Sequence, residues 1–137
     1  MGGGGLYGTA RHGGKFNGAQ VLQPETVALM SQNHIGDLEP GYMKTTAPNS
    51  SLDVDLPKLF PGPKWGLSFI INTKPGPAGR SPGSLSWAGL ANTYFWLDPA
   101  KRVAGVILTQ SLPFVDPQAI KLYGRFESGV YKAIGSA

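Results

Sequence analysis

The sequence predicts an α+β fold in which helices cover an antiparallel β-sheet. Short apolar stretches rich in β-branched and aromatic residues lie between residues 65 and 110, separated by turn residues. The connections between them are mostly too short for a parallel crossover, so neighbouring strands should run antiparallel. Apolar residues then recur at helical spacing from residue 120 onward, which predicts a closing helix that needs a sheet to lie on.

The elements can be assigned in order along the chain. Pro24 suits the first position of a helix over residues 24–33, and Gly36 supplies its stop. Four strands should follow, at residues 65–72, from residue 85 onward, and at residues 93–97 and 102–110. Asp116 is a good cap for the closing helix, and Pro117 suits its first position.

The 137 residues are enough for one domain, which we expect over residues 1–137 in three parts. Residues 1–20 are rich in glycine and should form a loop, because glycine loses the most backbone entropy on folding. Residues 36–63 carry several prolines and no regular period, which indicates a long loop. Residues 64–137 should hold the sheet and the closing helix.

Composition excludes several classes of function. The chain has no cysteine, which removes disulfides, thiolate metal sites and cysteine nucleophiles. The two histidines, His12 and His34, lack the spacing of a zinc site, so we expect no metal and no cofactor.

The formal net charge of +4 comes from scattered basic residues, whereas nucleic-acid binders concentrate theirs on one face. We therefore expect no nucleic-acid partner. No stretch approaches the roughly 20 apolar residues of a membrane span, and no signal peptide is visible. The chain would be cytoplasmic if Met1 is the natural start, but the sequence leaves the compartment open.

Two glycine-containing stretches match known functional motifs but lack the flanking secondary structure that those motifs need. Residues 3–8 read G-x-G-x-x-G, but no strand precedes them to deliver a dinucleotide. Residues 79–83 match the G-x-S-x-G nucleophile elbow around Ser81. Pro82 follows that serine and has no N–H to give an oxyanion, and no helical pattern follows, which favours a surface turn.

One resemblance covers nearly the whole chain. Residues 86–99 (SWAGLANTYFWLDP) and 103–110 (VAGVILTQ) are similar to the C-terminal part of the serine β-lactamase and penicillin-binding-protein superfamily. Within it, the class C-like carboxylesterases of family VIII look the most alike. Residues 2–11 and 22–30 resemble consecutive segments of the same family.

The resemblance implies a small-molecule ester or β-lactam substrate. In that family a serine of a Ser-x-x-Lys motif is acylated, with lysine and a tyrosine handling protons. A third motif, Lys-Thr-Gly or Trp-x-Gly, lies on a strand that lines the cleft, and Trp87-Ala88-Gly89 matches it here. The N–H of Leu90 would then donate to the oxyanion. Without the resemblance, Trp87 reads as an aromatic packed on a strand face.

The chain contains no Ser-x-x-Lys motif, and a helical segment of the family is missing after Arg11. We therefore expect an incomplete domain, a C-terminal fragment that carries the third motif without the nucleophile. Two alternatives stay open: a small stand-alone esterase that uses Ser81 or an oligomer-built site, and a non-catalytic binding or structural module. Because the strand at residues 102–110 would lose its neighbour, we also expect a homo-oligomer.

Overall fold

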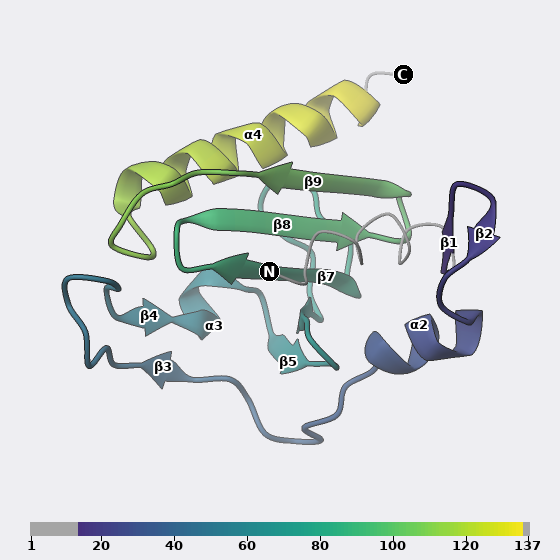
Figure 1. The fold of residues 1–137 in the computed structure, drawn as a ribbon, viewed down its shortest axis with the longest axis horizontal. Helices are drawn as coiled ribbons and strands as arrows, with labels where there is room; N and C mark the ends of the chain where they lie inside the picture. The colour runs from purple at the N-terminus through teal and green to yellow at the C-terminus, as the bar shows by residue number, and fades with distance from the viewer. Residues whose placement is uncertain (1–13, 136–137) are drawn as a thin grey trace.

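The computed structural model describes residues 14–135, and its centre is a five-stranded antiparallel sheet (Figure 1). The strands lie in sequence order, each paired with its neighbour: β5 (Pro63–Trp65), β6 (Ile70–Asn72), β7 (Ser84–Gly89), β8 (Thr93–Asp98) and β9 (Val103–Ile107). The antiparallel α+β fold predicted from the sequence is confirmed. The glycine motif at residues 3–8 and His12 lie outside the described residues.

The two faces of the sheet pack against different partners because side chains alternate along each strand. Trp96 of β8 makes ring contacts with Tyr123 and Tyr131 of α4 (Pro117–Gly135), the long helix at the top of Figure 1. The opposite face carries a core of five buried residues, with Met30 of α2 (Pro24–Met30) packed against it. That core consists of Phe69, Ile71, Leu85, Phe95 and Leu97.

The strand predicted over residues 65–72 was wrong, because the structure splits this segment into β5 and β6 around a tight turn. Gly66 donates its N–H to the carbonyl of Phe69, and Ser68 has a left-handed φ of 77°. A Cβ on Gly66 would lie 2.3 Å from the carbonyl oxygen of Met30, so helix α2 fixes the position of this turn.

Two segments expected to be loops contain short regular elements. Residues 14–20 include a hairpin of β1 (Lys15–Phe16) and β2 (Ala19–Gln20), whose two-residue Asn17–Gly18 turn has φ values of 49° and 81°. Asn-Gly is the typical pair for such a turn. Residues 36–63 include a two-stranded ladder and a short helix: β3 (Tyr42–Met43), β4 (Val54–Asp55) and α3 (Leu56–Leu59).

Strand β9 lies at the edge of the sheet and is shorter than the predicted 102–110. It begins after Arg102, whose φ of 54° ends the turn from β8. Val106 is 45% exposed, and Leu108 just beyond the strand is 77% exposed. Among residues 14–135, β9 pairs only with β8, so its outer edge has no strand partner there.

Candidate functional site

The residues of the expected third motif lie at the end of β7. Trp87, Ala88 and Gly89 pair with Phe95, Tyr94 and Thr93 of β8. On the other side, the ladder from β6 ends at Ser86 because β6 begins only at Ile70. Within the described part of the chain, the last three residues of β7 therefore have a strand neighbour on one side only.

Gly89 and Leu90 lie where β7 ends. The nearest heavy atom to a Cβ built on Gly89 is 3.7 Å away, on Thr93, so packing in residues 14–135 does not require glycine here. Leu90 follows directly and is 58% exposed. Among residues 14–135, nothing packs closely against Gly89, which is compatible with a backbone that a substrate must approach.

The Asn92 side chain fixes the turn that follows Leu90. Asn92 is fully buried and has a left-handed φ of 58°, a conformation that asparagine tolerates. Its Nδ2 donates to the carbonyls of Ser111 and Pro113 at 2.9 and 2.8 Å. Its Oδ1 accepts from the Tyr94 hydroxyl at 2.6 Å and from the Asp116 N–H at 3.1 Å. The turn is thereby joined to the segment that leads into α4.

Trp87 itself is packed rather than free. Its ring meets Trp65 of β5 edge to face, with centroids 4.6 Å apart and an interplanar angle of 78°. It also packs, partly buried, against both hydrophobic clusters of the sheet. This packing is compatible with the expected role of Trp87 in the third motif, because a side chain that lines a binding site must be held rigidly.

A buried ion pair joins the loop before β7 to α4. Arg80 Nε and Nη2 donate to the two carboxylate oxygens of Glu127 at 2.9 and 2.7 Å. The two residues are 6% and 7% exposed. Arg80 Nη2 also donates to the Tyr123 hydroxyl at 3.1 Å, and burial raises the pKa of that hydroxyl to about 12.

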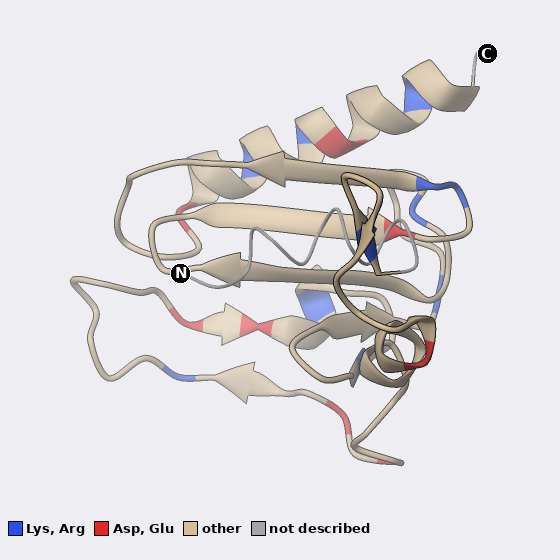
Figure 2. Ribbon diagram, turned by 45° about the vertical axis from the view of Figure 1, so that its right-hand side comes forward, with Lys and Arg blue, Asp and Glu red and all other residues tan. Residues whose placement is uncertain are grey.

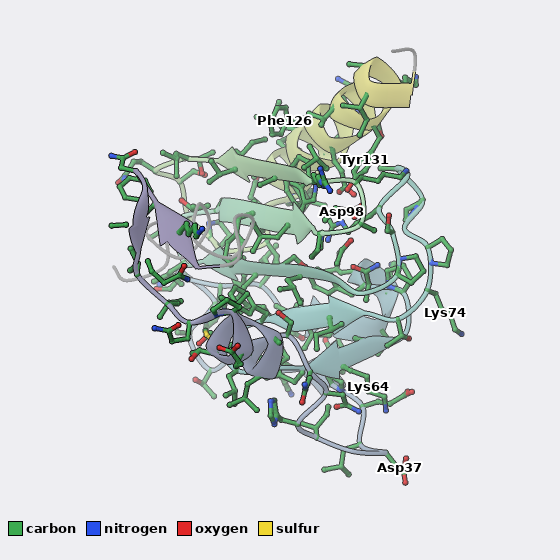
Figure 3. The ribbon with its side chains drawn as sticks, turned by 90° about the vertical axis from the view of Figure 1, so that its right-hand side faces the viewer. Asp37, Lys64, Lys74, Asp98, Phe126 and Tyr131 are labelled. Atoms are coloured by element: carbon green, nitrogen blue, oxygen red, sulfur yellow. The ribbon has the colours of Figure 1, made fainter. Side chains whose placement is uncertain are left out.

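A second polar cluster centres on Asp98 at the end of β8, beside Tyr131 (Figure 3). The carboxylate accepts hydrogen bonds from the Tyr131 hydroxyl at 2.9 Å and from the N–H groups of Ser81 and Lys101. Burial alone would raise the pKa of Asp98, but these hydrogen bonds to the charged form outweigh it and hold the pKa below its usual value.

The structure does not bring the other sequence candidates to the third motif. Ser81 lies in the loop before β7, and Leu90 lies just past the opposite end of that strand, roughly 17 Å of strand away at the usual rise. Ser81 leads through a turn into a strand, so the strand–serine–helix context of a nucleophile elbow is absent at this serine. His34 is exposed and contacts the carbonyl of Leu29 through Nε2.

Sequence reasoning missed the Arg80–Glu127 pair. The spacing of four residues could have indicated it, because Glu127 lies midway between Tyr123 and Tyr131, and both tyrosines face the sheet from α4. A carboxylate at such a buried position needs a cation nearby.

Residues 14–135 contain no group of acidic, histidine and cysteine side chains that could hold a metal ion. No helix in that range is long and apolar enough to cross a membrane.

Comparisons with known proteins show what this chain is similar to. The family model described as Beta-lactamase matches residues 1–128. A relative, the acyltransferase calJ of Penicillium decumbens, is 29% identical over 105 residues, which is 75% of this chain and 25% of calJ.

Two solved structures share the fold. The LovD6 mutant of simvastatin synthase from Aspergillus terreus matches with a TM-score of 0.73 at 24% identity, covering 96% of this chain and 33% of the synthase. A beta-lactamase from Mycobacterium bovis matches with a TM-score of 0.61 at 16% identity, covering 94% of this chain and 42% of that enzyme. The chain thus spans between a quarter and about two fifths of the length of these proteins.

Proposed function

Because the chain belongs to the beta-lactamase family, we propose that it supplies one wall of a serine-hydrolase active site whose nucleophile lies on another segment. In this proposal residues 1–137 are a single incomplete domain, and Trp87-Ala88-Gly89 is the third motif. The proposal assigns the acylated serine to another segment, because these residues contain no Ser-x-x-Lys motif. The observation that carries the proposal is the open edge of β7 beside Gly89.

The Leu90 N–H is the group proposed to act on the substrate. A serine hydroxyl would attack the carbonyl of an ester or β-lactam, and its proton would pass to the basic groups of the nucleophile segment. The carbonyl oxygen then becomes an oxyanion, which the N–H of Leu90 would stabilise. Collapse of this intermediate breaks the bond to the leaving group and yields an acyl-enzyme, which water or another acceptor cleaves.

Complementation in trans tests this role. The 137-residue chain is mixed or coexpressed with the N-terminal part of a family member that carries Ser-x-x-Lys, and hydrolysis of a p-nitrophenyl ester is followed. Leu90→Pro removes the N–H and should lower kcat about 10²- to 10³-fold, whereas Leu90→Ala keeps the N–H and should change it little. Equal activity of two folded variants would contradict the proposal.

A fluorophosphonate probe separates the alternatives. We expect no serine of the isolated chain to be labelled. Labelling at Ser81 that Ser81→Ala abolishes would instead favour a stand-alone esterase. If neither labelling nor complementation occurs, the non-catalytic module is the better reading.

We also propose that the chain forms homo-oligomers through β9. Its outer edge has no strand partner in residues 14–135, and Val106 and Leu108 are exposed beside it. Unpaired edges with apolar side chains favour pairing with another chain. Light scattering at micromolar concentration should show an oligomer that Val106→Lys weakens, while Leu38→Lys, at an exposed site elsewhere, leaves it intact. A monomeric wild type would refute this.

A further inference from the structure

A groove of about 680 Å³ lies on the α4 side of the sheet, between α4, β7 and the segment at residues 54–61. Its volume falls within the roughly 300–1,000 Å³ typical of small-molecule sites. Trp87 and Ala88 line it, whereas Gly89 and Leu90 do not, so the groove adjoins the proposed oxyanion donor without including it. The walls are largely apolar and include Leu56, Phe60, Tyr94, Phe114 and Ile120.

The groove follows α4 for most of its length. Ile120, Gly124, Ser128 and Lys132 all line it, and their spacing of four residues places them in one row along the helix. At 1.5 Å per residue this row is about 18 Å long. A Cβ on Gly124 would have no heavy atom within 4 Å, so the middle of the groove is open. The groove is therefore elongated along α4.

Positive charge is concentrated around this apolar channel. Five of its lining residues are cationic and one is acidic. The acidic residue, Glu127, is already paired with Arg80. Lys58, Lys121 and Arg125 make no ion pair with the described residues, and basic residues recur along α4 in Figure 2. The remaining cationic side chain is Lys132.

We propose that this groove binds an amphipathic carboxylate, with its acyl chain along α4 and its carboxylate at the cationic rim. The apolar length provides burial for an extended chain, and the lysine and arginine side chains provide charge complementarity that a neutral or cationic amphiphile lacks. Trp87 and Ala88 belong both to this groove and to the proposed third motif, but binding in the groove needs no catalytic serine and can be measured without turnover.

Fluorescence quenching by 12-bromododecanoate, below its micellar concentration, tests the proposal on the 137-residue chain. Trp87 lines the groove, so the brominated chain should quench its emission with one site per chain. From decanoate to dodecanoate the dissociation constant should fall about two- to fourfold per methylene. Dodecyltrimethylammonium should bind at least about tenfold more weakly, because its headgroup is repelled by the rim.

Two variants locate the site. Gly124→Leu fills the open middle of the groove and should abolish saturable quenching, whereas Gly135→Leu, on the same helix outside the groove, should not. At either glycine an added Cβ would meet no heavy atom within 4 Å, and circular dichroism checks that both variants fold. Lys121→Glu with Arg125→Glu should weaken dodecanoate binding about tenfold or more, and Lys44→Glu, outside the groove, should not.

The proposal is overturned if Gly124→Leu binds like wild type, or if anionic and cationic amphiphiles bind equally. It is also overturned if light scattering shows that Gly124→Leu dissolves a dimer, since a second copy of the chain would then be the occupant.

Discussion

The indole ring of Trp96 lies directly over the α-carbon of Gly105, its cross-strand partner on β9. A Cβ on Gly105 would lie 2.0 Å from the ring carbon Cη2. The ring is fully buried and has aromatic neighbours on α4, among them Phe126, so it has little room to move.

Gly105→Ala should therefore destabilise the protein. Overpacking of this kind typically lowers the free energy of unfolding by about 1–3 kcal/mol, and occasionally more. Urea unfolding measures the change. Gly129→Ala is the matched control: its Cβ would meet open space on α4, and alanine should raise helix stability by up to about 1 kcal/mol. Equal stability of Gly105→Ala and wild type would show that the ring is not fixed there.

The second prediction concerns the contribution of the Arg80–Glu127 ion pair to stability. Arg80→Met leaves a buried carboxylate without its cation, which typically lowers the free energy of unfolding by about 3–5 kcal/mol. The double variant Arg80→Met with Glu127→Leu removes both charges and should recover much of that loss. A double variant that is less stable than Arg80→Met would show that the pair is not what the single substitution disrupts.

Asp98 should make stability depend on acid pH. Its folded-state pKa is lowered, so the contribution is present above the unfolded-state pKa of about 3.9 and is lost as pH falls through the folded-state value. The free energy of unfolding should therefore drop as pH falls below about 4. Asp98→Asn should flatten that dependence. Tyr131→Phe should flatten it partly, because it removes one of the hydrogen bonds to the carboxylate, together with the bond from Trp96 Nε1. Parallel pH curves for Asp98→Asn and wild type would contradict this.

Asn92 should be intolerant of replacement. Asn92→Ala leaves the buried Tyr94 hydroxyl and the carbonyls of Ser111 and Pro113 without this partner, and it places alanine at a left-handed φ. We therefore expect a loss of at least about 2 kcal/mol in the free energy of unfolding. Aspartate also adopts a left-handed φ, so Asn92→Asp keeps the backbone conformation and the Oδ1 acceptor but loses the hydrogen bonds that Nδ2 donates. Comparing it with Asn92→Ala separates the contribution of these donations from that of the backbone and Oδ1. The exposed Asn49→Ala should have little effect. Thermal unfolding of the three variants is the measurement.

Much of the sheet and the closing helix could be predicted because their signals are local. The apolar stretch of β8 ends at Asp98, and Pro117 begins α4 as expected. The turn that separates β5 from β6 could not be predicted, because it depends on the contact between Gly66 and Met30 of a distant helix.

The site was only partly accessible from sequence. The proposed third motif is a continuous stretch, so a resemblance was enough to propose Trp87-Ala88-Gly89 from the sequence. The groove is built from α4, β7 and the segment before β5, and its Arg80–Glu127 pair joins residues 47 positions apart. Only the fold brings these side chains together.

The Asn92 side chain gives the two halves of the molecule a mechanical connection. It fixes the turn that follows Leu90. It also accepts a hydrogen bond from the N–H of Asp116, the residue just before α4. A displacement of the helix relative to the sheet would therefore pull on the backbone next to Leu90. One buried amide side chain therefore joins the turn after Leu90 to the start of the helix that lines the groove.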